Sequence, residues 1–145
     1  MTLRVAMIGY GFMGATHSVG WRQAPRMFDL PAAVEMAVIV GRNADAVAAA
    51  AEKWGWAESA TDWREVIARD DIDIVDIVTP GDSHAEIAIA ALEAGKHVLV
   101  EKPLTATADQ ARRLIDEAAR RGLRLMVDLT FAYSGAVRRI RELVR

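Results

Sequence analysis

The chain has 145 residues, of which 52% are hydrophobic and 26% charged, and its formal net charge is −2. These values exclude a disordered chain and give no electrostatic reason to expect a nucleic acid or a membrane surface as partner. The absence of cysteine excludes disulfides, thiolate catalysis and cysteine-ligated zinc. The length suits one domain with a sizeable core, no apolar run could span a bilayer, and no leader is evident, so we expect a cytoplasmic protein.

Strands and helices alternate along the chain. Apolar runs such as 36–40 predict strands buried on both faces, as in parallel sheets that helices cover on both sides. Asn43 is expected to cap one helix and Gly55 to end it. We expect strands at about 3–8, 35–40, 57–60, 73–78, 97–100 and 123–129, helices at about 12–23, 43–54, 62–68, 83–93, 107–121 and 134–145, and a connection at 25–31.

This alternation predicts βαβ units and therefore a Rossmann-type α/β fold, a doubly wound parallel sheet of about six strands with helices on both faces. Ligands of such sheets bind at the carboxyl ends of the strands, near the point where the strand order reverses. The residues directly after each strand are therefore the candidates for function.

Three glycines follow the first predicted strand in the spacing G-x-G-x-x-G: Gly9, Gly11 and Gly14. Gly9 permits a tight turn, Gly11 lets a pyrophosphate approach the backbone, and Gly14 lets the next helix pack close to the strand. The start of that helix adds unpaired N–H groups and a positive dipole end. Glycines also end strands without any function, but the position between a strand and a helix favours dinucleotide binding.

Gly41 and Arg42 follow the second predicted strand, where many NAD-binding proteins carry a carboxylate for the ribose. An arginine there can pair with a 2′-phosphate. We therefore expect NADP or NAD as cofactor, with NADP slightly favoured. A solvated arginine in a turn would explain the same residue.

Thr79 and Pro80 follow the fourth predicted strand, and His84 lies in the first turn of the next helix. His84 either borders the cofactor cleft or is an ordinary polar residue at a helix start. No second histidine or carboxylate stands at metal-ligand spacing, so the sequence predicts no metal site. His17 and His97 are expected to be structural.

Glu101, Lys102 and Pro103 follow the fifth predicted strand. A lysine at the carboxyl end of a central strand points into the cleft, where it can serve proton transfer or bind a hydroxyl. Taken alone, a surface lysine at a strand end explains the residue as well. Pro103 fixes the shape of the turn and could follow a cis peptide bond.

The stretches GYGFMG, IDIVDIVTPGDSHAEIAIAALEAGKHVLVEKPL and RLMVD resemble the glucose–fructose oxidoreductase / inositol dehydrogenase (Gfo/Idh/MocA) family. The second stretch is the specific one, because order, spacing and the AGKHVxxEKP run all agree. The resemblance covers nearly the whole chain but only the N-terminal half of the family's proteins, whose C-terminal α/β domain shapes the sugar pocket and supports oligomers. It implies a dinucleotide-binding domain at 1–130 and, at 131–145, a helix leading toward a substrate domain.

The resemblance also implies roles for single residues. Lys102 would be the catalytic residue, assisting hydride transfer between the nicotinamide and a hydroxyl or carbonyl carbon of a sugar, polyol or nucleotide sugar. The implied cofactor contacts are Gly9, Gly11, Gly14, Phe12 and Met13 at the pyrophosphate, Gly41 and Arg42 near the adenosine ribose, Thr79, Pro80 and His84 along the cleft, and Glu101, Lys102 and Pro103 near the nicotinamide.

The family's further catalytic Asp and His, in a D-x-x-x-H pattern, belong to the C-terminal domain. We therefore expect this chain to bind a dinucleotide but to turn over substrate poorly or not at all. The alternative is a non-enzymatic nucleotide-binding or assembly module of the same fold. Val137, Ile140, Leu143 and Val144 form an apolar stripe, which predicts that the last helix packs back on the domain or mediates homo-oligomer formation.

Overall fold

The computed structural model describes residues 1–144 and contains a single six-stranded sheet in the order β3-β2-β1-β4-β5-β6. All neighbouring strands are parallel, so the predicted Rossmann-type fold is confirmed. The strand order reverses between β1 and β4. The strands are β1 (Thr2–Ile8), β2 (Ala33–Val40), β3 (Glu58–Ala60), β4 (Ile74–Ile77), β5 (His97–Val100) and β6 (Leu125–Val127); the helices are α1 (Phe12–Met27), α2 (Ala44–Trp54), α3 (Trp63–Ile67), α4 (His84–Glu93), α5 (Ala108–Arg121), the 3₁₀ helix η1 (Thr130–Tyr133) and α6 (Gly135–Leu143).

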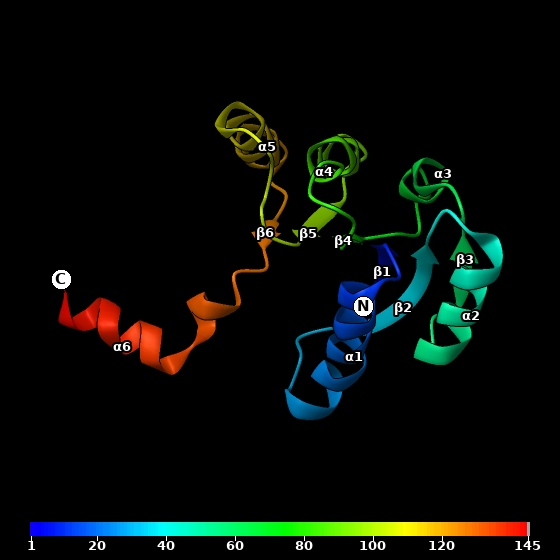
Figure 1. The fold of residues 1–145 in the computed structure, drawn as a ribbon, viewed down its shortest axis with the longest axis horizontal. Coiled ribbons are helices and arrows are strands. Elements are labelled where there is room, and N and C mark those ends of the chain that lie inside the picture. The colour runs from blue at the N-terminus through cyan, green and yellow to red at the C-terminus, as the bar shows by residue number, and fades with distance from the viewer. Residues whose placement is uncertain (145) are drawn as a thin grey trace.

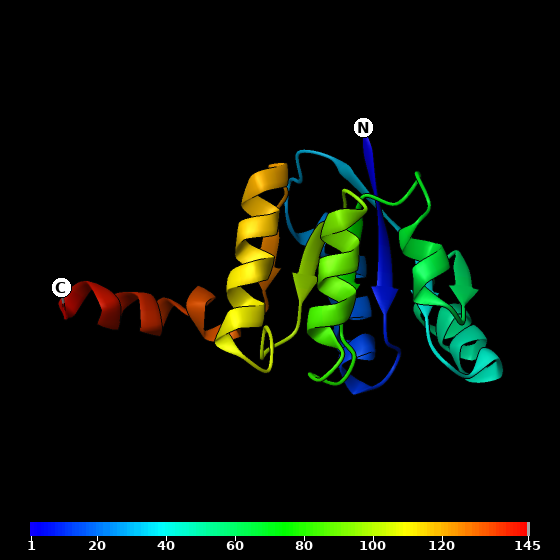
Figure 2. The same ribbon diagram turned by 90° about the horizontal axis from the view of Figure 1, so that it is seen from above.

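Helices cover both faces of the sheet. Figure 1 shows α1 and α2 on one side of the strands and α3, α4 and α5 on the other, and Figure 2 shows α4 and α5 lying roughly lengthwise along the strands. Successive strand residues alternate between two cores: Met7 and Ile39 pack toward α2, whereas Ala6 and Val38 pack toward the α3–α5 layer. Because both faces are buried, these strands are apolar at nearly every position, as the sequence predicted.

Local capping signals place several helix ends where the sequence predicted them. The Asn43 side chain accepts a hydrogen bond from the Ala46 N–H, and Gly55 ends α2 with φ +79°. Thr107 and Gln110 form a reciprocal capping box at the start of α5. These interactions join residues at most four positions apart, which is why the sequence alone reveals them.

Helix α1 is longer than predicted, and the expected end at about residue 23 is wrong. The helix continues through Pro25 to Met27, and the N–H of Phe28 still bonds to the Ala24 carbonyl at 3.0 Å. Pro25 lies in the last turn, so its missing N–H removes one bond near an exposed helix end. The connection to β2 is correspondingly shorter than the predicted segment 25–31, and β6 is shorter than the predicted 123–129.

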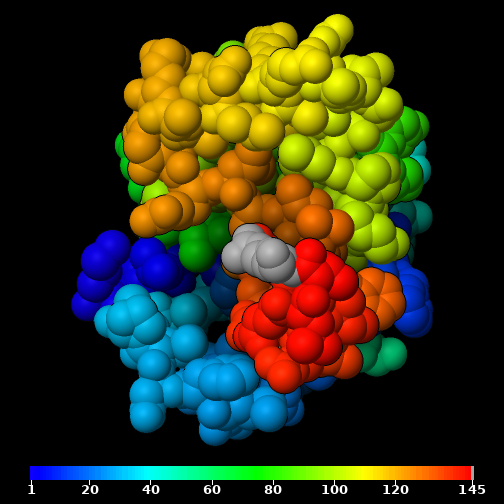
Figure 3. Space-filling model, turned by 90° about the vertical axis from the view of Figure 1, so that its left-hand side faces the viewer, coloured from blue at the N-terminus to red at the C-terminus, as the bar shows by residue number. Residues whose placement is uncertain are grey.

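The segment after β6 leaves the body of the molecule. None of the residues of η1 is buried, nor is any described residue of α6, and Leu143 is 68% exposed. In Figure 2 α6 extends away from the sheet, and Figure 3, seen from that side, shows it as the nearest element. The prediction that this helix packs back on the domain is therefore wrong, because η1 turns the chain outward and the stripe faces no element of the body. Self-association stays a prediction, and the predicted helix end at residue 145 lies outside the described residues.

Within residues 1–144, no helix has the length and apolar character needed to cross a membrane.

Candidate functional site at the carboxyl edge of the sheet

The glycine loop between β1 and α1 occupies the carboxyl edge at the strand-order reversal. Gly9 has φ +117°, and a Cβ there would lie 3.0 Å from Val78; a Cβ on Gly14 would lie 2.7 Å from the Gly9 carbonyl oxygen. A Cβ on Gly11, in contrast, would meet no atom within 4 Å. The turn and the helix packing thus require Gly9 and Gly14, whereas nothing inside the domain requires Gly11.

Helix α1 begins directly at this loop. Gly11 is the N-cap and provides no side-chain acceptor, and Phe12, the first helical residue, is 85% exposed. The N–H groups of the first turn, including those of Phe12 and Met13, have no intrahelical acceptor. The edge therefore offers donors and a positive helix end to an anion.

Gly41 and Arg42 lie beside the glycine loop, because the Gly9 N–H bonds to the Val40 carbonyl at 2.8 Å and joins the ends of β1 and β2. A Cβ on Gly41 would lie 2.0 Å from the ring of Tyr10. Gly41 is thus needed for the close packing of this ring, a contact that sequence reasoning missed. The Arg42 side chain is exposed at this corner.

His84 is buried and joins the loops after β4 and β5. Its Nδ1 lies 2.8 Å from the Pro103 carbonyl oxygen and its Nε2 lies 2.7 Å from the Thr79 carbonyl oxygen. The peptide bond between Lys102 and Pro103 is cis. The structure therefore brings together Thr79, His84 and Pro103, which the sequence placed after two different strands, and gives His84 a definite role in holding the two loops.

Ser83 stands at the N-cap position of α4, but its side chain does not cap the helix. Its Oγ donates within the loop that precedes the helix, at 2.7 Å from Thr79 Oγ1 and 2.8 Å from the Pro80 carbonyl oxygen. The hydroxyl thereby fixes the turn that carries Thr79 and Pro80 at the carboxyl edge.

Glu101 and Lys102 differ sharply in exposure. The Glu101 carboxylate is buried, and its Oε2 accepts the Lys102 N–H at 2.8 Å. The Lys102 Nζ lies 3.8 Å from the same Oε2, while 65% of the side chain is exposed. Glu101 therefore fixes the backbone of the turn and leaves the ammonium accessible at the rim.

A buried polar cluster lies beneath this rim. His17 Nδ1 lies 3.0 Å from Asp76 Oδ2, which also accepts the Trp21 Nε1–H at 2.7 Å. His17 Nε2 lies 3.5 Å from Glu101 Oε1 and 3.3 Å from Asp128 Oδ2. Burial alone lowers the pKa of His17, but the hydrogen bond to Asp76 and the surrounding carboxylate charges outweigh it and raise the pKa above its ordinary value.

The sequence predicted only that His17 and His97 are structural. His97 fits this structural role, since its Nδ1 accepts a hydrogen bond from the Arg124 N–H at 3.0 Å. The sequence did not predict that three carboxylates surround His17, because these carboxylates come from β4 and from the loops after β5 and β6. One signal was visible: Asp76 is a charged residue inside an apolar strand, and such a residue must find a partner.

Comparison with known proteins identifies the family. Residues 3–129 match the family model described as the oxidoreductase family with an NAD-binding Rossmann fold (Gfo/Idh/MocA). The chain belongs to this family. The resemblance drawn from the glycine loop and from the residues around Lys102 is thereby confirmed.

Similar proteins in the Gfo/Idh/MocA family are dehydrogenases and reductases. A levoglucosan dehydrogenase from Pseudarthrobacter phenanthrenivorans is 41% identical over 93% of this chain and 35% of its own length. The crystal structure of an oxidoreductase domain protein from Kribbella flavida is 55% identical with a TM-score of 0.87, covering 90% of this chain and 36% of that one. A 3-ketoreductase from Actinomadura kijaniata, solved with NADP and TDP-benzene, is 33% identical with a TM-score of 0.84, covering 99% and 42%.

The chain spans about 32–41% of the length of the curated relatives that it matches. What aligns is therefore the NAD-binding domain of the Gfo/Idh/MocA family. The relatives' activities belong to proteins more than twice as long.

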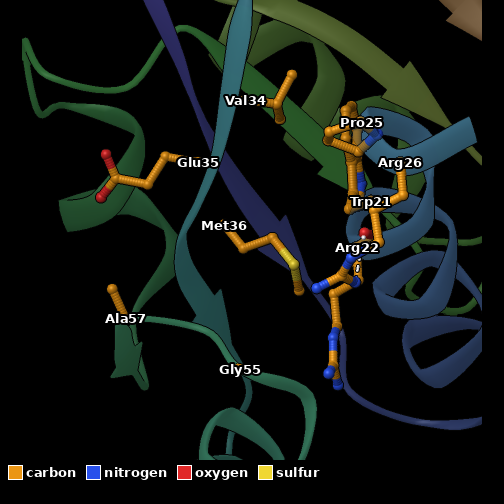
Figure 4. A pocket seen from close by; sticks show the side chains of 9 residues that line it. All are labelled: Trp21, Arg22, Pro25, Arg26, Val34, Glu35, Met36, Gly55 and Ala57. Atoms are coloured by element: carbon orange, nitrogen blue, oxygen red, sulfur yellow. Dashed lines mark hydrogen bonds between the residues drawn. The ribbon is translucent and has the colours of Figure 1, made fainter. Parts of the chain in front are cut away.

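A cavity of about 440 Å³ lies elsewhere, at the opposite end of the sheet between the last turns of α1 and the start of β2 (Figure 4). None of the predicted site residues lines it. Its lining consists of Trp21, Arg22, Pro25, Arg26, Val34, Glu35, Met36, Gly55 and Ala57.

Proposed function

We propose that this chain is the cofactor domain of an NAD(P)-dependent oxidoreductase that acts on a hydroxyl or carbonyl carbon of a sugar, polyol or nucleotide sugar. The observation that carries the proposal is the contrast among the three loop glycines. Gly9 and Gly14 serve the fold, whereas Gly11 leaves open space beside the start of α1. A pyrophosphate needs that space and those N–H donors.

The cofactor lies along the carboxyl edge in this proposal. Gly9, Gly11, Gly14, Phe12 and Met13 hold the pyrophosphate. Gly41 and Arg42 lie by the adenosine ribose, and the exposed guanidinium pairs with a 2′-phosphate when the cofactor is NADP. Support for both cofactors comes from related structures, a levoglucosan dehydrogenase with NADH and a 3-ketoreductase with NADP.

The nicotinamide lies near the loops after β4 and β5. Thr79, Pro80 and His84 border it on one side, and Glu101, Lys102 and Pro103 on the other. Lys102 is the catalytic residue, since its exposed ammonium can bind the reacting hydroxyl or take part in its proton transfer. The substrate class rests on relatives that include levoglucosan and inositol dehydrogenases and a nucleotide-sugar reductase.

Residues 1–130 form the dinucleotide-binding domain in this proposal, and 131–145 lead toward a substrate domain. Hydride transfer requires a substrate held at reacting distance from the nicotinamide. The cavity between α1 and the start of β2 lies at the opposite end of the sheet, away from the proposed cofactor edge. The 145-residue chain alone is therefore expected to bind cofactor without steady-state turnover, and no observation favours a non-enzymatic role.

The test is a titration of the chain with NADH and NADPH, followed by energy transfer from its tryptophans to the nicotinamide. Gly11→Ala should abolish or strongly weaken binding of both, because its Cβ would occupy the pyrophosphate position. The matched control is Gly20→Ala, which also places a Cβ in open space but on α1 away from the loop. Equal binding by both variants would contradict the proposal.

Arg42→Ala tests cofactor choice in the same titration. Selective loss of NADPH affinity supports the 2′-phosphate contact, whereas equal effects on NADH and NADPH remove Arg42 as a selector. A robust steady-state rate with a polyol or sugar would contradict the expected inactivity of the chain alone.

A further inference from the structure

The cluster around His17 has an unusual distribution of charge. Three carboxylates, those of Asp76, Glu101 and Asp128, surround one imidazole. Asp76 is fully buried and Glu101 nearly so, and the only lysine or arginine nitrogen within 4.0 Å of these carboxylates in the described chain is Lys102 Nζ, 3.8 Å from Glu101 Oε2 on a side chain that is 65% exposed. Buried charges of one sign require a counter-charge, which is either a proton or a cation.

His17 presents one ring nitrogen to this cluster without a hydrogen-bond partner. The side chain is 6% exposed, and Nε2 is one of two buried side-chain nitrogen or oxygen atoms among residues 1–144 that lack a hydrogen-bond partner. Nδ1 is occupied, since it donates to Asp76, and Trp21, one turn further along α1, donates to the same carboxylate oxygen. This arrangement of carboxylate, histidine and free Nε2 is the one that orients histidines toward metal ions in proteins.

The distances around Nε2 also point to a metal ion. A protonated imidazole bonded to carboxylates would draw their oxygens to about 2.7–2.9 Å. The oxygens of Asp128 and Glu101 instead lie at 3.3 and 3.5 Å, and the three ligand atoms lie within 4.8 Å of one another. With metal–ligand bonds of about 2.0–2.2 Å, neighbouring ligands of a tetrahedral zinc ion are about 3.4 Å apart.

The carboxylate oxygens that face His17 Nε2 are available to bind a metal ion. Glu101 uses Oε2 to accept the Lys102 N–H, which leaves Oε1 turned toward His17. The Asp128 side chain is 32% exposed, so the cluster has a route to solvent. The ligand set of one imidazole and two carboxylates suits zinc better than calcium or magnesium, which prefer oxygen ligands throughout.

We propose that His17 Nε2, Glu101 Oε1 and Asp128 Oδ2 bind a single Zn²⁺ ion, with Asp76 and Trp21 orienting the histidine. The ion joins α1 to the loops after β5 and β6. Since Glu101 also holds the backbone of Lys102, zinc binding fixes the base of the turn that carries this lysine. The proposal does not depend on the cofactor or on the proposed reaction.

The experiment is a calorimetric titration of the chain with ZnCl₂ after removal of metals by EDTA and dialysis, on protein produced without a histidine tag. Wild-type protein should bind one ion per chain. Asp128→Asn should weaken binding at least about tenfold, because it removes a charged ligand. The matched control is Asp116→Asn, an exposed carboxylate on α5, which covers the opposite face of the sheet from α1; this variant should leave the affinity unchanged.

A second readout separates this site from surface binding. Co²⁺ in place of zinc should give the intense visible absorption of a tetrahedral site in wild type and Asp116→Asn, and not in Asp128→Asn. If circular dichroism shows that Asp128→Asn is unfolded, Glu101→Gln is the replacement. Absence of stoichiometric zinc binding, or equal binding by wild type and the folded ligand variant, would overturn the proposal.

Discussion

The two ends of the sheet gather the same kinds of side chain in different surroundings. At the amino end, Arg4 pairs with Glu35 at 2.5 Å and with Asp71 at 3.2 Å, and Arg69 pairs with Glu58 at 2.7 Å. These side chains are 27–47% exposed. At the carboxyl end, the cluster around His17 contains Asp76, which is 0% exposed, together with His17 at 6%, Glu101 at 7% and Asp128 at 32%.

The two ends differ in the free-energy cost of removing one partner of an ion pair. Water can replace a lost partner at the amino end, so each exposed pair there contributes about 0–1 kcal/mol. A buried charge that loses its partner costs about 3–5 kcal/mol. The amino end is therefore a solvated network, whereas the carboxyl end is a fixed polar arrangement beneath the proposed cofactor.

The largest expected effect compares one carboxylate from each end. Asp76→Ala should lower the free energy of unfolding by about 3–5 kcal/mol, because His17 Nδ1 and Trp21 Nε1 both lose their acceptor. Glu35→Ala should cost less than about 1 kcal/mol. Urea denaturation in the presence of a chelator measures both, and equal losses would break the distinction between the two ends.

An intermediate effect concerns the backbone of the carboxyl end. Gly14→Ala should cost about 1–3 kcal/mol, since its Cβ would lie 2.7 Å from the Gly9 carbonyl and must push α1 away from β1. Gly11→Ala should leave the thermal midpoint nearly unchanged while it removes dinucleotide binding. The reverse result, with Gly11→Ala the more destabilising variant, would refute the division of roles among these glycines.

The smallest effect is the acid response of the amino end. The hydrogen bond from Arg69 lowers the pKa of Asp71 from 3.8 to about 2. A lowered folded pKa gives stability that is present above pH 3.8 and is lost as the pH falls toward 2. The melting temperatures of wild type and Asp71→Asn should therefore differ slightly near neutrality and converge across this window. Asp116→Asn, an exposed carboxylate without an ion-pair partner among the described residues, should show no such convergence.

Much of the fold could be predicted because its signals are local. The apolar runs, the cap at Asn43 and the glycine spacing after β1 act over a few residues, and the structure confirms the strands and helices predicted from them. The end of α1 was mispredicted because Pro25 is tolerated in a last turn. The outward course of α6 was not predictable, since an apolar stripe does not specify the surface it contacts.

The candidate site divides in the same way. The sequence by itself determined which residues follow the strands, because a parallel βαβ order forces their carboxyl ends to one edge. Only the tertiary structure decided that Tyr10 packs on Gly41, that His84 holds two loops together, and that His17 meets carboxylates from residues 76, 101 and 128. Such contacts depend on the packing of segments that are distant in the sequence, so the spacing of residues along the chain does not predict them.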